Sequence, residues 1–197
     1  MATNTKDKVL EAAHSLFEQK GFDGVSMRDI ASEAKVNKGL LHYYFKSKHA
    51  IFMGVFKLVS KLVYVNLSDI LNRKDIDFDA KIDLMVDSYF DLLTKHPKMP
   101  LFVLSELGKY PEFAAGTDLG GTLNEAALLI ENNLNELQPV PEGEGFQFLM
   151  SMVSLCVFPF MAAPIVTAVK PRKYADNQQF MMARKTQIKQ TLKKSYK

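Results

Sequence analysis

Residues 26–48 read SMRDIASEAKVNKGLLHYYFKSK, and this stretch predicts two short helices joined by a tight turn. Ser26 followed by Asp29 is the S-x-x-D arrangement that opens a helix. Asn37 is suited to cap the second short helix, and Ser47 the helix that follows it. Two short helices with such a turn are typical of a helix-turn-helix, whose second helix enters the major groove of DNA.

The outward side of the second short helix is polar and aromatic. Leu41 and Phe45 are four residues apart, so we expect them to face inward together. The other positions then present a cation, an imidazole, two phenols and a glycine that permits close backbone approach. The amides at the start of the helix after Ser47, together with Lys48, form a candidate phosphate site.

The preceding segment supports a small helical bundle. An amphipathic helix is predicted before Gly21, which occupies the position of a left-handed cap after Lys20. The residues expected to share the core of this bundle are Leu16, Phe17, Phe22, Val25, Ile30, Ala34, Val36, Leu41 and Phe45.

Residues 9–52 resemble the N-terminal domain of the TetR family of bacterial transcriptional regulators. The matching residues are Ala12, Ala13, Leu16, Phe17, Gly21, Ser26, Ile30, Ala31, Ala34, Val36, Lys38, Gly39, Leu41, Tyr44, Phe45, Ser47 and Lys48. His42 departs from the pattern, because the family usually has tyrosine there. The resemblance implies a homodimer in which the last two long helices of each subunit form a four-helix bundle and the preceding helices enclose a small-molecule pocket.

From the motif and this resemblance we expect a DNA-binding surface on the N-terminal domain. Arg28 would meet a base or a phosphate from the first motif helix, and Ser26 would meet a phosphate. Lys38 and Leu40 would reach base edges, with Leu40 against a thymine methyl group. The remaining contacts would hold the backbone and set the register, and the full set is Ser26, Arg28, Asn37, Lys38, Gly39, Leu40, His42, Tyr43, Tyr44 and Lys48.

Beyond residue 48 the pattern predicts helices over 77–96, 100–110, 117–137, 146–169 and 176–194, with no strand of period two. The expected fold class is all-α: an N-terminal three-helix bundle with a helix-turn-helix over 1–48, and a larger helical ligand-binding and dimerisation domain over 49–197. The single cysteine excludes an internal disulfide and fits a reducing compartment. The first residues lack a secretion signal, so we expect a cytoplasmic protein.

Charge is distributed unevenly along the chain. Residues 1–48 carry eight basic and six acidic side chains, residues 49–169 eight and fifteen, and residues 170–197 nine and one. The basic C-terminal segment is either a solvated helix face or a further contact to nucleic acid, and the first interpretation is the more common. Asp79, Asp83, Asp87 and Asp91 repeat every four residues. We expect this stripe to face water, the alternative being selection of a cationic ligand or a metal.

Residues 146–169 contain no charged residue. Their length admits a transmembrane helix. The positive flank is C-terminal, however, so the positive-inside rule would place the DNA-binding motif outside the cell. We therefore expect no membrane partner and a helix buried on all sides, against a second subunit and against a ligand. Cys156 within it is expected to be inert.

The chain has ten methionines and fourteen phenylalanines, which suit an adaptable apolar pocket. The candidate pocket residues are Tyr89, Phe102, Tyr110, Phe113, Met150, Met152, Phe158 and Met161. The alternative for each of them is an ordinary core position.

The predicted function is a DNA-binding transcriptional regulator, most often a repressor in this family. It would bind a palindromic operator as a homodimer and be released or modulated by a small, largely apolar effector. The alternative is a helical DNA-binding protein without an effector. The four scattered histidines form no metal motif, and no nucleophile, base and orienting acid can be nominated. We therefore expect no enzyme activity, no cofactor and no metal.

Overall fold

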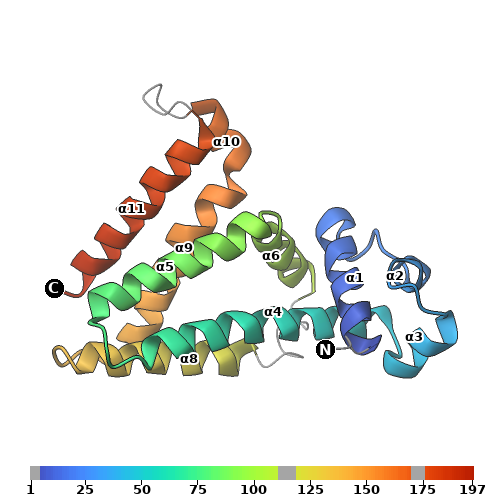
Figure 1. The fold of residues 1–197 in the computed structure, drawn as a ribbon, viewed down its shortest axis with the longest axis horizontal. Coiled ribbons are helices and arrows are strands. Elements are labelled where there is room, and N and C mark those ends of the chain that lie inside the picture. The colour runs from blue at the N-terminus through green and yellow to red at the C-terminus, as the bar shows by residue number, and fades with distance from the viewer. Residues whose placement is uncertain (1–4, 111–118, 170–175) are drawn as a thin grey trace. The chain divides into compact units, whose positions relative to one another are not determined.

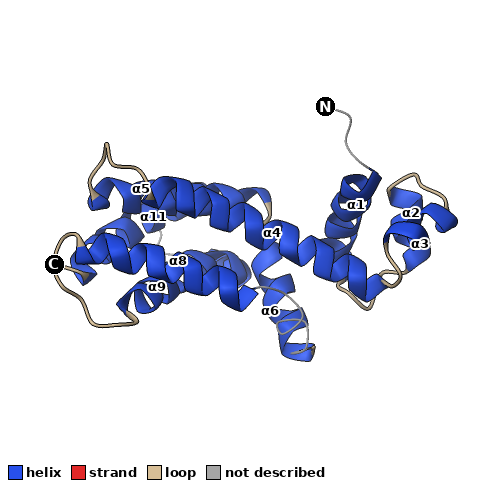
Figure 2. Cartoon of the chain, turned by 90° about the horizontal axis from the view of Figure 1, so that it is seen from below, coloured by secondary structure: helices blue, strands red, loops and turns tan. Residues whose placement is uncertain are grey.

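Helices account for the regular structure of this protein in the computed structural model, which describes residues 5–110, 119–169 and 176–197 (Figures 1 and 2). No strand occurs within those ranges, so the all-α prediction is confirmed. In chain order the helices are α1 (Thr5–Lys20), α2 (Met27–Glu33), α3 (Lys38–Tyr44), α4 (Lys48–Leu71), α5 (Phe78–Lys95), α6 (Met99–Lys109), α8 (Leu119–Asn135), α9 (Glu144–Met161), α10 (Ala163–Val169) and α11 (Asn177–Ser195).

The described residues divide into two compact units. The first lies within Met1–Leu62 and Leu101–Gly120, and the second within Val63–Pro100 and Gly121–Lys197. The first unit therefore takes in α6 as well as the start of α4, in addition to the predicted helix-turn-helix. The functional boundary at residue 48 stays a prediction, because α4 begins at Lys48 and supplies residues to both units.

The core of the first unit is aromatic. The ring of Phe17 lies 5.8 Å from that of Phe22, 5.7 Å from that of Phe52 and 6.2 Å from that of Phe102, measured between centroids. The predicted core positions all belong to this cluster, although Phe22, Ala34 and Val36 are only partly buried. The cluster also has buried members outside the predicted set, among them Phe52 on α4 and Phe102 on α6, and Phe102 lies farthest along the chain from the motif.

Three helices of the second unit, α5, α9 and α11, pack against one another, with α8 against α9. The segment 146–169, predicted as one helix, contains most of α9 and all of α10, because the helical conformation is interrupted at Ala162. Pro159 lies inside α9, whereas Pro164 falls in the first turn of α10, where a missing N–H costs no helical hydrogen bond.

The expectation that residues 146–169 are buried on all sides is not met within a single chain. One side of α9 is buried, including Phe148, Met152 and Cys156. Phe158 on the same helix is 64 % exposed, and α10 has no buried residue. Cys156 is fully buried, and this burial raises the pKa of its thiol to about 12, which agrees with the expected inertness.

Two described helices, Lys48–Leu71 and Glu144–Met161, are long and apolar enough to cross a bilayer by length and composition alone. The same properties characterise a core helix of a soluble protein. Each of the two has one side lined by buried side chains, such as Phe52 on α4 and Met152 on α9.

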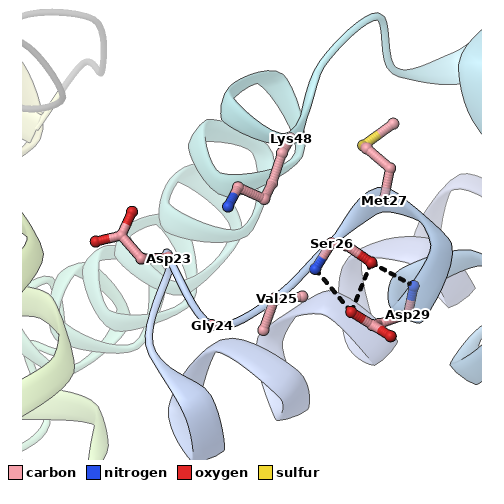
Figure 3. Close-up of a pocket in the computed structure, with 7 residues that line it drawn as sticks. All are labelled: Asp23, Gly24, Val25, Ser26, Met27, Asp29 and Lys48. Carbon is pink, nitrogen blue, oxygen red and sulfur yellow. Dashed lines mark hydrogen bonds between the residues drawn. The ribbon is translucent and has the colours of Figure 1, made fainter.

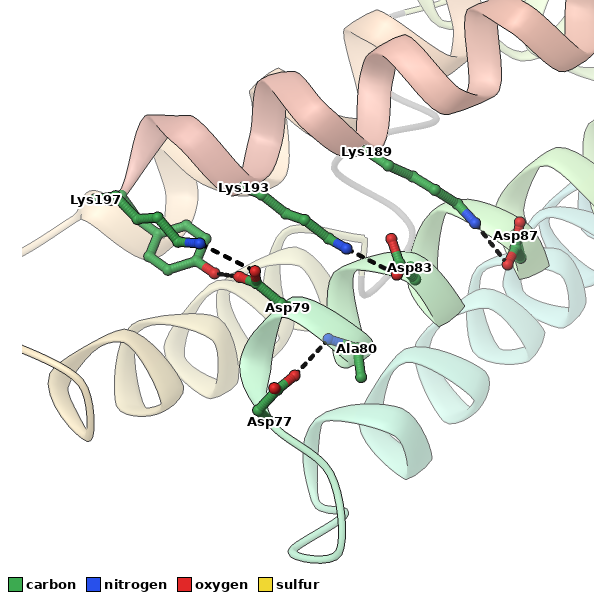
Figure 4. Close-up of polar contacts among 9 residues, drawn as sticks. Asp77, Asp79, Ala80, Asp83, Asp87, Lys189, Lys193 and Lys197 are labelled. Atoms are coloured by element: carbon green, nitrogen blue, oxygen red, sulfur yellow. Dashed lines mark hydrogen bonds and ion pairs between the residues drawn. The ribbon is translucent and has the colours of Figure 1, made fainter.

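The aspartate stripe of α5 does not simply face water. Asp79, Asp83 and Asp87 form ion pairs with lysines of α11, while Asp91 is exposed and has no ion pair with any described residue (Figure 4). The expectation of a solvated stripe was therefore wrong for these three residues. Repetition every four residues places them on one side of α5, and that side meets another helix.

A buried lysine joins three helices of the second unit. Lys81 on α5 is 4 % exposed and donates hydrogen bonds to the Leu71 carbonyl (2.9 Å) and to Asn133 Oδ1 (2.6 Å). Burial lowers the pKa of this ammonium group. The contact satisfies a carbonyl at the C-terminus of α4, where a cation is favourable.

Candidate nucleic-acid interface

The first motif helix begins with the capping box that the sequence predicted. The amide of Asp29 donates to Ser26 Oγ (3.2 Å), and the amide of Ser26 donates to Asp29 Oδ2 (2.8 Å). The Ser26 hydroxyl also donates to Asp29 Oδ2 (2.6 Å), as Figure 3 shows. Hydrogen bonds from the Ser26 side chain and amide lower the pKa of Asp29, which keeps the carboxylate ionised at the start of α2.

The turn between the two motif helices is closed by a left-handed residue. Lys35 has a φ of 56°. The amide of Val36 donates to the Ala31 carbonyl (3.0 Å) and that of Lys35 to the Ser32 carbonyl (3.2 Å), which is the Schellman pattern. The Asn37 side chain then accepts a hydrogen bond from the Leu40 amide (2.8 Å), so its predicted role as the cap of α3 is confirmed.

Because Lys35 adopts a positive φ, a β-branched residue there is strained. We predict that Lys35→Val lowers the free energy of unfolding by about 1–2 kcal/mol. Lys35→Asn loses the same charge but tolerates the left-handed region, so it should stay close to the wild type. Denaturant unfolding followed by circular dichroism checks this, and equal losses in both variants would contradict the assigned turn.

Helix α3 presents a continuous outward face. Leu41 is fully buried in the first unit, which turns Lys38, Gly39 and His42 outward, where all three are exposed. Tyr43 is 73 % exposed, and its ring meets the neighbouring Tyr44 ring edge-on at 5.2 Å. Leu40 is half-buried beside this face. A short helix with its anchor on one side and these groups on the other has the form of a recognition helix.

The cations of the motif differ in their availability. Arg28 and Lys38 are exposed, and neither has a hydrogen bond or ion pair with any residue in the described ranges. Lys48 instead donates to the Phe22 carbonyl (2.8 Å), and its Nζ lies 4.2 Å from the centroid of the Phe22 ring. Arg28 and Lys38 can therefore approach a phosphate without first breaking a contact.

A surface pocket of about 400 Å³ lies beside Lys48 and the start of α2. Figure 3 shows its lining: Asp23, Gly24, Val25, Ser26, Met27, Asp29 and Lys48. Asp23 and Asp29 place two carboxylates there, and the Ser26 hydroxyl is already bound to Asp29. Phosphate contacts from Ser26 and Lys48 stay predictions, and each of these groups has an intramolecular partner in the structure.

Two candidate pocket residues on and after α6 belong to the first unit. Phe102 stacks on Phe17, and the Tyr110 hydroxyl donates to Asp23 Oδ1 (2.9 Å). The Tyr110 ring also lies 5.7 Å from that of Phe22. The sequence predicted neither contact, since each joins residues that are far apart in the chain.

Glu106 and Lys109 extend the contact between α6 and the loop before α2. Lys109 lies 3.2 Å from the buried carboxylate of Glu106 and 4.0 Å from Asp23, measured from Nζ to the nearest carboxylate oxygen. Hydrogen bonding to Glu106 raises the pKa of Lys109. The end of α6 is therefore tied to the loop that precedes the first motif helix by charge as well as by ring packing.

The other candidate pocket residues lie in the second unit, apart from Phe113, which is outside the described residues. Tyr89 is half-buried, and the burial of its hydroxyl raises its pKa to about 12. Met152 is buried, Met150 and Met161 are half-buried, and Phe158 is exposed. Their role in ligand binding stays a prediction.

Comparison with protein families identifies the motif. Residues 9–55 match the family model of bacterial regulatory proteins, tetR family. The chain is 29 % identical to the probable HTH-type transcriptional regulator YttP of Bacillus subtilis over 183 residues, which cover 86 % of this chain and 83 % of that protein. It is 28 % identical over 119 residues to the biofilm operon icaADBC HTH-type negative transcriptional regulator IcaR of Staphylococcus aureus, covering 58 % of this chain and 60 % of that protein.

Solved structures agree on the fold. The fatty acid degradation regulator FadR of Bacillus halodurans superposes with a TM-score of 0.73 at 16 % identity, over 98 % of this chain and 96 % of that one. A TetR transcriptional regulator from Legionella pneumophila superposes with a TM-score of 0.69 at 21 % identity, over 97 % and 99 %. These similar proteins are transcriptional regulators and not enzymes.

Proposed function

The chain belongs to the TetR family of bacterial transcriptional regulators, and from that premise we propose that it binds a palindromic operator as a homodimer and represses transcription. The observation that carries the proposal is the outward face of α3, where Lys38, His42 and Tyr43 are exposed around a buried Leu41. In a helix-turn-helix this face lies in the major groove, where cations and phenols reach base edges and phosphates. Operator binding places the protein in the cytoplasm.

Dimerisation is supported by large apolar side chains that are exposed on the last helices. Four large apolar side chains on α9, α10 and α11 are more than half exposed: Phe158 at 64 %, Ile165 at 67 %, Val169 at 72 % and Met182 at 63 %. Exposed apolar side chains of this size favour a second copy of the chain as their cover. A two-fold dimer would present two α3 helices to two half-sites of an operator.

The proposed effector is a small, largely apolar molecule bound among methionine and aromatic side chains of the second unit. Met150, Met152 and Tyr89 are buried or half-buried there, as such a site requires. Contacts of α6 with the motif offer a route for its effect, since Tyr110 bonds to Asp23 in the loop before α2. An effector regulates only if it binds one arrangement of the dimer more tightly than another.

Selection from random duplexes with purified protein tests the central proposal. We expect an enriched palindrome whose half-sites are spaced by about one helical turn or more. Enrichment of no sequence at moderate ionic strength would refute operator binding. A panel of apolar compounds in a thermal shift assay then separates an effector-controlled regulator from one without effector, which would show no shift.

We predict that Lys38→Ala changes which base is preferred in each half-site, because Lys38 starts the exposed face of α3 and has no partner among the described residues. The expected loss at the position it reads is about 1–3 kcal/mol of discrimination. Lys57→Ala is the control, since it removes an equal charge from an exposed position of α4. If selection returns the wild-type site unchanged for Lys38→Ala, the assignment fails.

A further inference from the structure

Helices α5 and α11 carry opposite charges at the same spacing. Residues 177–197 contain six basic and no acidic side chains. Lys189 pairs with Asp87 (2.8 Å), Lys193 with Asp83 (2.7 Å) and Lys197 with Asp79 (3.0 Å). Figure 4 shows the three pairs side by side along the two helices, which run in opposite directions. We call this set, with Lys185, the lysine ladder.

Further contacts are made to the aspartates at both ends of the ladder. Lys185 also pairs with Asp87 (2.9 Å), so one carboxylate meets two ammonium groups. Partial burial opposes ionisation of Asp87, but hydrogen bonds from Lys189 and Lys185 outweigh it and lower its pKa. At the other end the Tyr196 hydroxyl donates to Asp79. The carboxylates of α5 thus form ion pairs with Lys185, Lys189 and Lys193 of α11 and with Lys197 just beyond it.

The pairs lie at the surface and are individually weak. The side chains of Lys193 and Asp83 are 25 % and 39 % exposed, and that of Lys197 is 61 % exposed. Pairs of this kind contribute about 0.2–1 kcal/mol each and are screened by salt. A denser array of negative charge can therefore compete with the aspartates for the ammonium groups.

Apolar contacts hold α11 in place without the ladder. Ile188 is fully buried and Leu192 is 1 % exposed, while the ring of Tyr196 lies 5.1 Å from that of Phe78. Lysine has a long flexible stem that ends in a compact charge. The ammonium groups can consequently change partner while the helix remains packed.

We propose that the lysine face formed by Lys185, Lys189 and Lys193 of α11 and by Lys197 just beyond this helix is a second contact surface for the DNA backbone. The aspartates of α5 mask this face as an internal substitute for phosphates. Four residues of helix rise about 6 Å, so the face extends for roughly 18 Å. One strand of B-DNA presents a phosphate every ~3.4 Å along the axis, enough for each lysine to find one over that length. Masking restrains non-specific binding, so that α3 governs where the protein binds.

The test compares two variants that each lose three negative charges, at different positions. Asp79→Asn/Asp83→Asn/Asp87→Asn removes the partners of the ladder. The control is Asp69→Asn/Asp91→Asn/Glu142→Gln, at exposed positions that have no ion pair with any described residue. Binding to a random-sequence duplex is measured by fluorescence anisotropy across a salt series.

We expect the ladder variant to bind this duplex at least about tenfold more tightly at low salt, with a log–log salt slope steeper by up to about 3.6 for four phosphate contacts. The control should keep the wild-type slope. Introducing Lys185→Gln, Lys189→Gln, Lys193→Gln and Lys197→Gln into the ladder variant should abolish its gain in duplex affinity. Equal slopes in the ladder variant and the control would overturn the proposal.

Three further measurements test the inference. Binding of the ladder variant to phosphatidylglycerol vesicles but not to duplex would overturn it in favour of a membrane surface. Thermal unfolding by circular dichroism verifies that the variant is folded, and Asp83→Asn against Asp91→Asn repeats the comparison with a single change. The inference rests on the chain binding DNA. The difference between the ladder variant and its control on random duplex reports the lysine face, whereas failure of the proposed function is seen as absence of a selected sequence in the wild type.

Discussion

Gly145→Ala is expected to lower the free energy of unfolding by about 3 kcal/mol. A Cβ atom at residue 145 would lie 2.1 Å from the carbonyl oxygen of Ala127 and 2.7 Å from the amide nitrogen of Glu131. Both are backbone atoms of α8, so no rotamer change relieves the overlap. The helices α8 and α9 must separate instead.

Separation of these helices would also remove a cap. Glu131 on α8 accepts hydrogen bonds from the amides of Gly143 (2.8 Å) and Gly145 (3.2 Å) at the start of α9. Those amides lack helical partners, and a carboxylate is favourable at that end of a helix. Any movement that accommodates a methyl group at 145 therefore also lengthens these hydrogen bonds.

Denaturant unfolding followed by circular dichroism measures this loss. Gly120→Ala is the control on the same helix α8, because a Cβ atom there meets no atom of the described residues within 4 Å. It should leave stability unchanged or slightly raised, as alanine favours a helix over glycine. A Gly145→Ala protein as stable as this control would show that α9 does not pack on α8 through residue 145.

Phe17→Ala is expected to cost about 3–5 kcal/mol of stability and to abolish specific DNA binding. Phe17 is fully buried, and its ring contacts those of Phe22, Phe52 and Phe102. Removing it leaves a cavity among three rings that hold α1, α4 and α6 in one core. The outward face of α3 depends on that core because its anchor, Leu41, is buried in the same cluster.

The measurements are thermal unfolding and binding to the selected operator. Phe146→Ala serves as the control, because that ring is 38 % exposed and lies outside the core of the first unit. Phe17→Leu should recover part of the stability, since it restores most of the apolar volume. Wild-type operator affinity in a Phe17→Ala protein would contradict the proposal that the recognition helix depends on this core.

Local interactions made the motif predictable from sequence. The caps of α2, α3 and α4 each join a side chain to an amide three residues later, as in Ser26 to Asp29, Asn37 to Leu40 and Ser47 to Ala50 (3.1 Å). Such contacts depend only on residue type and spacing. The buried positions of α2 and α3 followed from helical periodicity for the same reason.

Interactions between distant segments were not predictable in this way. An aspartate every four residues looks the same whether it faces water or a lysine on another helix, so the partners of Asp83 and Asp87 appeared only with the packing of α5 on α11. The apolar pattern of Phe102 likewise suits a ligand pocket or a core, and the fold assigned it to the core of the first unit.

The sequence by itself therefore determined the all-helical architecture, the helix-turn-helix and the set of residues on the outward face of α3. Tertiary structure alone decided which charges are available: Arg28 and Lys38 form no hydrogen bond or ion pair with the described residues, whereas Lys48 donates to Phe22 and the lysines of α11 pair with α5. The physical reason is that spacing along a helix determines which side chains share a face, while the partner of that face depends on how helices pack.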